Sequence, residues 1–353
     1  MFVAVNPFIS LFRKRLHRGA RIALAMGAAL LAAHTPAAAL TVLMGDELAA
    51  HSEFVQYLRA GQEPGSRFDL VRLSPGGADT PQATETASTE PERSANASVN
   101  AGVRTRSLRA LASDANLTMA VGMPAARAAL ERPGQQPLVL AMLSRLDYEN
   151  LRATSPALRR GDRRVGVLLR DPAMADQLAL VGAVLPQKQR IGVVATPESE
   201  PLVRELQRAA QGGSPPWDVQ VEYAPDAKSL AASLRAVVPR SDALMVLPDL
   251  IGDSQAATLS VLRAGAEAGL PVFGASEGLV RSGGLAAAVS TPAQLAQQAR
   301  LLGQKLASSG GGASPLVESA TPAAVRVNAT VARGLGLRLP EERELAERLT
   351  VTR

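Results

Sequence analysis

The sequence lacks cysteine altogether and has only three histidines, His17, His34 and His51, among its 353 residues. The absence of cysteine excludes disulfides, thiolate metal sites, a cysteine nucleophile and lipid attachment through an N-terminal cysteine. No histidine follows residue 51 either, so a transition-metal site is not expected. We therefore expect neither a metal nor a cofactor.

Signatures of catalysis are missing as well. Residues 274–278 read G-A-S-E-G and match the G-x-S-x-G turn of serine hydrolases after a predicted strand. No histidine follows this turn, so Ser276 has no imidazole base of that kind. Neither G-x-G-x-x-G after a strand nor G-x-x-x-x-G-K-[ST] occurs, which removes the usual phosphate cradles of dinucleotide-binding and P-loop enzymes. We expect no catalytic residues and no enzyme.

Positive charge is concentrated at the beginning of the chain. The formal net charge is +6, but residues 1–39 hold five basic side chains and no acidic one. The remainder has 33 basic against 32 acidic residues, so it offers no electrostatic footprint for DNA or RNA. Nucleic acid is not expected as a partner.

Residues 1–39 have the three parts of a secretory signal peptide. Basic residues stand at 13–21, an apolar run covers 22–33, and Ala37, Ala38 and Ala39 supply small residues ahead of a cleavage site. As a helix the run spans only about 18 Å, short of a bilayer of roughly 30 Å. We expect cleavage after Ala39 and a periplasmic protein that begins at Leu40; an uncleaved anchor or a buried helix is the alternative.

Beyond residue 39, short aliphatic strands alternate with helical patterns. Most of the strands are unbroken apolar runs, as in parallel strands covered on both faces. The expected strands are 40–44, 68–73, 117–121, 138–143, 164–169, 190–195, 219–223, 243–247, 271–275 and 284–289. Ten strands are too many for one small sheet, so the pattern predicts an α/β, doubly wound chain with two Rossmann-like lobes. Residues 74–101, rich in Gly, Pro, Ser, Thr, Ala and Glu, interrupt the pattern and predict a low-complexity surface insertion.

Several stretches of the second half resemble, in order, those of a known family. They are 165–169 (VGVLL), 177–180 (QLAL) with 185–186 (LP), 189–194 (QRIGVV), 242–249 (DALMVLPD), 270–276 (LPVFGAS), 280–286 (VRSGGLA), 325–328 (VRVN) and 334–340 (GLGLRLP). The set resembles the ABC-transporter substrate-binding proteins, in particular the periplasmic subgroup of tryptophan/tyrosine-type binders. The resemblance covers residues 162–348 well and 40–150 in outline.

The resemblance implies the type I periplasmic binding protein fold, in which crossing strands join two α/β lobes and a hinge motion closes ligand in the cleft between them. On this basis we expect a signal peptide at 1–39 and lobe 1 at 40–170, including the insertion 74–101. Lobe 2 is then expected at 171–285, followed by a return to lobe 1 and a C-terminal tail at 286–353.

Ligands of open α/β sheets bind beyond the carboxyl ends of the strands, where free N–H groups at helix starts suit a carboxylate. The loops after the predicted strands supply the candidate ligand-binding residues: Gly45, Asp46, Gly122, Met123, Pro124, Ala125, Arg170, Asp171, Thr196, Ser199, Pro248, Asp249, Ser276 and Glu277. Arg170 is suited to an acidic group of the ligand, and Asp249 or Glu277 to an amine. In the alternative without a ligand role, Asp171 and Pro172 only begin a helix.

Two departures from the family pattern bear on the ligand. Where the family has a Thr and an Asn around its Pro-Thr-Asp stretch, this chain has Asp249, Leu250 and Ile251, and the aromatic pair expected after Ala288-Val289 is replaced by Ser290-Thr291-Pro292. Only seven aromatic residues lie beyond residue 39. Because sugar sites stack on aromatic faces, this scarcity disfavours a sugar and weighs against an aromatic amino acid.

We therefore expect the periplasmic solute-binding component of an ABC importer that captures an amino acid or a small carboxylate. Its partners would be the small-molecule solute and an ABC permease of the inner membrane, with the protein itself a monomer or weak dimer. The alternative is a non-transport envelope protein that keeps the fold and acts as a protein-interaction or accessory factor. The altered site loops and residues 74–101 favour that alternative, and a periplasmic enzyme stays open as a third.

Overall fold

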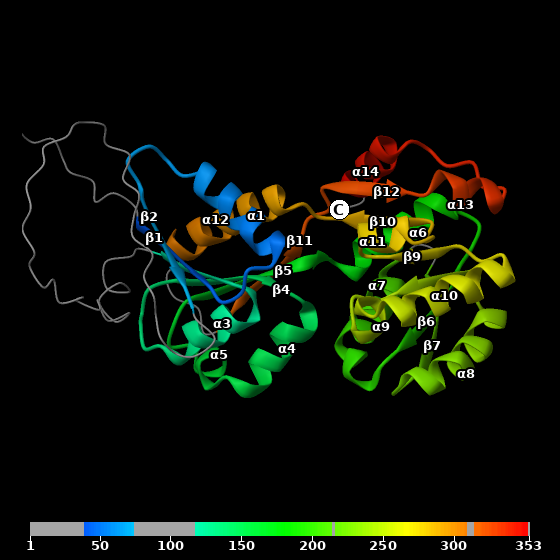
Figure 1. Cartoon of the computed structure of the whole chain (residues 1–353), viewed down its shortest axis with the longest axis horizontal. Coiled ribbons are helices and arrows are strands. Elements are labelled where there is room, and N and C mark those ends of the chain that lie inside the picture. The colour runs from blue at the N-terminus through cyan, green and yellow to red at the C-terminus, as the bar shows by residue number, and fades with distance from the viewer. Residues whose placement is uncertain (1–38, 74–116, 214–215, 309–313, 352–353) are drawn as a thin grey trace, which may run out of the picture. The chain divides into compact units, whose positions relative to one another are not determined.

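The computed structural model describes residues 39–73, 117–213, 216–308 and 314–351 (Figure 1). The expected signal peptide, except for Ala39, and the expected insertion at 74–101 lie outside the described residues. Within the described part of the chain, no helix combines the length and the apolar character needed to cross a membrane.

The first lobe is built on a six-stranded sheet, parallel throughout, in the order β11-β5-β4-β3-β1-β2. Its strands are β1 (Ala39–Met44), β2 (Arg67–Arg72), β3 (Leu117–Val121), β4 (Leu138–Leu143), β5 (Val165–Pro172) and β11 (Leu316–Ala320). On one face lie α1 (Ala49–Ala60) and α12 (Pro292–Ser308); on the other lie α3 (Gly122–Glu131), α4 (Arg145–Thr154) and α5 (Pro156–Arg160) (Figure 1). Because side chains alternate along a strand, Val42 enters one apolar core and Leu43 the other.

The second lobe has a six-stranded sheet in the order β12-β10-β9-β8-β6-β7, in which only β12 is antiparallel. Its strands are β6 (Arg190–Ala195), β7 (Asp218–Tyr223), β8 (Ala243–Val246), β9 (Val272–Gly274), β10 (Ala286–Val289) and β12 (Ala324–Val327). One face carries α6 (Met174–Val184), α7 (Glu200–Gly212), α13 (Ala329–Gly334) and α14 (Glu342–Val351). The other carries α8 (Ala227–Val237) and α10 (Gln255–Ala268), and the short helices α9 (Leu250–Asp253) and α11 (Glu277–Arg281) follow β8 and β9.

The chain passes between the two sheets after β5, after β10 and after β11. The expected two-lobe α/β fold with crossing strands is confirmed, and all ten expected strands are present. The expected return of residues 286–353 to the first lobe describes α12 and β11 only, since β10 and β12 pair with each other in the second sheet. The sequence did not indicate β11 and β12, which are mostly half-exposed and carry charged or polar residues.

Side-chain amides reinforce the crossing segments. Gln177 of α6 is buried, and its Nε2 donates to the carbonyl oxygen of Ala288 (2.8 Å) while its Oε1 accepts from the Ala288 N–H (3.2 Å). The pairing of β10 with β9 stops at Ala287, so Gln177 takes the place of a strand at the next residue. Gln298 makes the same pair of contacts to Ser319 and Thr321 from a half-buried position.

We expect Gln177→Leu to lower the free energy of unfolding by about 2–4 kcal/mol, because both backbone groups of Ala288 lose their partner while staying buried. Gln298→Leu removes the same chemistry where water reaches more easily, and its effect should be smaller. Urea unfolding of the two variants measures the difference, and equal losses would contradict the role given to burial.

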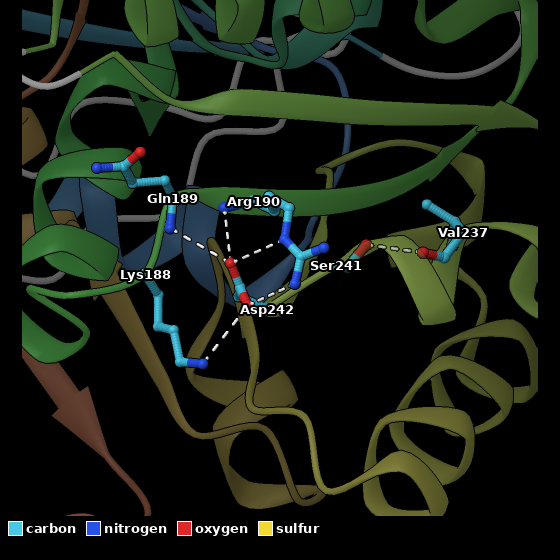
Figure 2. A network of polar contacts seen from close by, with 6 residues as sticks. All are labelled: Lys188, Gln189, Arg190, Val237, Ser241 and Asp242. Atoms are coloured by element: carbon cyan, nitrogen blue, oxygen red, sulfur yellow. Dashed lines mark hydrogen bonds and ion pairs between the residues drawn. The ribbon is translucent and has the colours of Figure 1, made fainter.

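At the amino ends of β6 and β8, Asp242 is the centre of a second polar network (Figure 2). Its carboxylate accepts from Arg190 Nη2 (3.0 Å) and Nε (3.2 Å) and from the backbone N–H of Arg190 (3.1 Å), and Lys188 Nζ lies 3.5 Å away. Hydrogen bonds from Arg190 hold the pKa of Asp242 well below its usual range. This carboxylate is therefore fully matched by donors.

Candidate functional site

A pocket of about 530 Å³ opens where β5, β8 and β9 end. Arg170 and Asp171 of β5 contribute from the first sheet, and the loops after β8 and β9 contribute from the second. The lining residues are Arg170, Asp171, Val246, Leu247, Pro248, Gly252, Asp253, Gln255, Thr258, Leu259, Ala275, Ser276, Gly278, Leu279 and Ser282. Of the predicted ligand-binding residues, the pocket thus unites Arg170, Asp171, Pro248 and Ser276.

One carboxylate oxygen of Asp171, a residue that lines this pocket, lacks a hydrogen-bond partner among the described residues. Its Oδ2 is shielded from solvent and accepts no hydrogen bond from any described residue. Arg170 Nε lies 3.5 Å from that oxygen, which is an ion-pair distance but not a hydrogen bond. About 21% of the Asp171 side chain stays exposed, and Asp171 is one of the residues that line the pocket.

The surroundings of Asp171 disfavour its negative charge. Burial raises its pKa from 3.8 to about 6; Arg170 opposes this shift, and the charges of Asp253 and Asp147 add to it. Asp253 itself lines the pocket, is exposed, and forms no ion pair with any described residue. Among the described residues that line the pocket, Arg170 is the one cation and Asp171 and Asp253 are the acids, so their ionised side chains sum to a net charge of −1.

The alternative that Asp171 and Pro172 begin a helix is wrong. Both residues belong to β5, and α6 begins two residues after Pro172, at Met174, with Ala173 as its N-cap. The pairing of β5 with β11 extends to this point, since Pro172 lies opposite Ala320. The carboxylate of Asp171 therefore does not cap α6.

Thr196, Ser199 and Asp249 form a buried internal network. Ser199 Oγ donates to Asp249 Oδ2 (2.5 Å) and lies 2.9 Å from Thr196 Oγ1. Asp249 Oδ1 accepts from the N–H groups of Ile251 (2.9 Å) and Gly252 (3.1 Å) and so caps α9. Burial raises the pKa of Asp249, and the hydrogen bond from Ser199 opposes that rise. Both carboxylate oxygens already have partners within the protein.

Ser276 and Glu277, after β9, lie differently from each other. Ser276 lines the pocket and its Oγ accepts from the Leu279 N–H (3.1 Å), which caps α11. Glu277 is exposed and lies 3.5 Å from Arg281 and 3.7 Å from Arg326. Glu277 is not among the residues that line the pocket.

The candidates of the first lobe gather around a residue that the sequence analysis did not single out, His51 of α1. Asp46 Oδ1 lies 2.5 Å from His51 Nδ1, and the imidazole is buried. Gly122, which begins α3 with φ +79°, lies against both side chains. Gly45 lies against Pro124 and Ala125, and Met123 is half-buried beside them. These residues are not part of the 530 Å³ pocket.

A signal for His51 was present in the sequence. His51, Phe54, Val55 and Leu58 recur at the spacing of one buried helix face, and His51 begins that series close to the loop after β1. Among the described residues, no three histidine, aspartate or glutamate side chains come together as metal ligands.

We expect Gly122→Ala to destabilise the protein by about 2–3 kcal/mol. Alanine disfavours the left-handed backbone conformation of this residue, and the added methyl group would clash with the imidazole of His51. A Cβ at Gly122 would lie 2.7 Å from His51 Cε1. Gly65 is the matched control, since its φ is +86° and a Cβ there would meet nothing within 4 Å. Thermal unfolding of Gly122→Ala and Gly65→Ala separates backbone strain from the clash; equal shifts would rule out tight packing at His51.

A family model described as ABC transporter substrate binding protein matches residues 93–346. Among solved structures, a substrate binding protein with adhesive properties from Clostridium difficile is 16% identical with a TM-score of 0.58, covering 86% of this chain and 96% of that one. A conserved domain protein from Vibrio cholerae is 19% identical with a TM-score of 0.51, covering 88% and 98%. A Streptococcus pneumoniae ABC domain in complex with L-Trp is 18% identical with a TM-score of 0.50, again covering 88% and 98%. No curated protein matches the sequence.

At these identities the structural likenesses establish the fold, two lobes of the type I periplasmic binding protein kind. The family match spans more than two thirds of the chain and includes every residue that lines the pocket.

Proposed function

We propose that this chain, which belongs to the ABC transporter substrate binding protein family, captures a small solute that bears an ammonium group, with an amino acid as the first candidate. The observation that carries the proposal is Asp171 Oδ2, which accepts no hydrogen bond from the described residues, on a residue that lines the pocket at the ends of β5, β8 and β9. A ligand ammonium would donate the hydrogen bonds that Asp171 Oδ2 lacks and would add a second positive charge beside that of Arg170.

The rest of the pocket suits the other parts of an amino acid. Among the described residues, Asp171 is the one carboxylate within ion-pair distance of the Arg170 guanidinium, and a ligand carboxylate would offer this guanidinium a bidentate partner. Gln255, Thr258 and Ser282 add polar groups. Leu247, Leu259 and Leu279 offer an apolar surface for a ligand side chain, and the described lining residues include no aromatic side chain on which a ring would stack.

In this proposal the protein is exported by residues 1–39, works in the periplasm as a monomer or weak dimer, and delivers its solute to an ABC permease of the inner membrane. The two lobes close on the solute, with Arg170 and Asp171 at the carboxyl end of the crossing strand β5. The protein binds and does not transform its ligand. A small carboxylate without an amine is the second candidate, because Arg170 alone suits it.

A panel built from matched compounds tests the proposal. Thermal unfolding of residues 40–353 is followed with each of several amino acids, with the amine that lacks its carboxylate, and with the acid that lacks its amine. A ligand at about 1,000 times its Kd adds roughly 4 kcal/mol, which shifts the midpoint by several degrees. We expect shifts with the amino acid and the amine, and little with the deaminated acid. If only acids shift the midpoint, Asp171 is not the anchor; if nothing does, the non-transport alternative gains.

A further inference from the structure

Strand β5 has a second charged pocket at its other end. Asp171 stands at the carboxyl end of β5, whereas a pocket of about 770 Å³ lies beside the amino end, at Val165. Its walls come from the end of α3, the following loop, and α4 and α5. The two pockets share no lining residue.

Arginine dominates the charge of this second pocket. Arg127, Arg132, Arg160 and Arg163 line it together with the acids Glu131 and Asp162. Within the described part of the chain, none of the four arginines forms an ion pair with a carboxylate. The lining therefore has a formal charge of +2 that the protein does not neutralise by direct contact.

Arg163 is fixed in place. Its Nε donates to the carbonyl oxygen of Gln136 (2.6 Å) and its Nη1 to that of Ala129 (3.3 Å), at the end of α3. Burial lowers the pKa of this guanidinium. Because these carbonyl groups are neutral, they orient the cation without cancelling its charge. Arg127 and Arg160 are exposed and Arg132 is half-buried, so they are free to adjust around a ligand.

A small cavity of about 20 Å³ adjoins this pocket through Arg132, Pro133, Gly134 and Arg163, which line both. The hydroxyls of Thr41 and Thr118, opposite each other on β1 and β3, line the cavity and lack a hydrogen-bond partner among the described residues. Both side chains are more than nine-tenths buried. Two unused donors thus lie next to the uncompensated arginines.

We propose that the pocket of Arg127, Arg132, Arg160 and Arg163 binds a phosphate-bearing anion, at a site separate from that of the solute. Guanidinium groups pair with phosphate through two parallel hydrogen bonds, and several of them around one pocket favour a multivalent anion over a single carboxylate. The phosphate comes either from a free anion or from a lipid headgroup, and the two sources are separated by experiment.

The test titrates the purified protein with inorganic pyrophosphate by calorimetry in phosphate-free buffer, and measures co-sedimentation with phosphatidylglycerol vesicles against phosphatidylcholine vesicles. The pocket variant is Arg127→Gln/Arg160→Gln. The control variant, Arg208→Gln/Arg333→Gln, removes the same charge from exposed helix positions of the second lobe. Among the described residues, each of these side chains donates hydrogen bonds to its own helix only.

We expect binding that weakens by about tenfold or more in the pocket variant and by less than about twofold in the control. Pyrophosphate binding identifies a free anion as the source, and binding to phosphatidylglycerol vesicles alone identifies the lipid. Absence of binding in both assays, or equal loss in the two variants, would overturn the proposal. Neither variant touches the pocket of Asp171, so solute binding is expected to persist in both.

Discussion

Asp171→Asn is expected to raise the free energy of unfolding of the ligand-free protein at pH 7 by up to about 3 kcal/mol. The reason is the raised pKa of Asp171. Burial disfavours the charged carboxylate, so the ionised group lowers the free energy of unfolding at any pH where it is charged in the native state. Asparagine keeps the shape and removes the charge. When replacing a binding-site residue stabilises the ligand-free protein, the native residue is one that serves ligand binding at a cost in stability.

The pH dependence of this effect follows from linkage. Between the unfolded pKa near 4 and the folded pKa of about 6, the native state binds more protons than the unfolded state. Stability contributed by Asp171 is therefore greatest below about pH 4, falls as the pH rises to about 6, and is constant above it. The difference between Asp171→Asn and the parent protein, measured by urea unfolding, should be small at pH 4 and full at pH 7.

Asp242→Asn is the matched control with the opposite sign. The pKa of Asp242 is lowered by hydrogen bonds from Arg190, so its contribution to stability is present above the unfolded pKa and is lost only in strong acid (Figure 2). Removing its charge should destabilise the protein at pH 7. If both asparagine variants move stability in the same direction, the charge of Asp171 is not what its surroundings disfavour.

Asp249→Ala is expected to destabilise the protein by about 2–4 kcal/mol, the second large effect. It would leave the N–H groups of Ile251 and Gly252 and the hydroxyl of Ser199 without their acceptor, and Asp249 is almost fully buried. Asp249→Asn keeps an N-cap oxygen and should change stability by less than about 1 kcal/mol. Urea unfolding measures both variants, and equal losses would show that capping is not the role of Asp249.

The interpretation of Asp249 illustrates what sequence reasoning can and cannot reach. The rule that ligands lie beyond the carboxyl ends of strands selected Arg170, Asp171, Pro248 and Ser276, which line one pocket in the structure, because apolar runs make the strand ends visible. It also selected Asp249. The hydrogen bonds that Ser199, Ile251 and Gly252 donate to Asp249 distinguish its carboxylate from that of Asp171, whose Oδ2 accepts none from the described residues.

Other features depend on residues far apart in the chain and left weaker signals. The edge strands β11 and β12 carry Glu318 and Arg326 and acquire their strand character from pairing with β5 and β10. The part of Asp253 in the pocket depends on how α9 is placed after β8. The arginine pocket combines α3 with α5 and the loop before β5, which no local motif connects.

The most direct measurement of the central claim is calorimetric titration, near pH 7.5, of one ammonium-bearing solute from the panel into the parent protein and into Asp171→Asn. The account predicts saturable binding to the parent and an affinity at least about 100-fold lower in the variant, since a ligand ammonium would lose its charged partner in a buried site. Because the variant is expected to be the more stable of the two, unfolding would not explain the loss. Equal affinity in both proteins would contradict the claim that Asp171 holds the ligand.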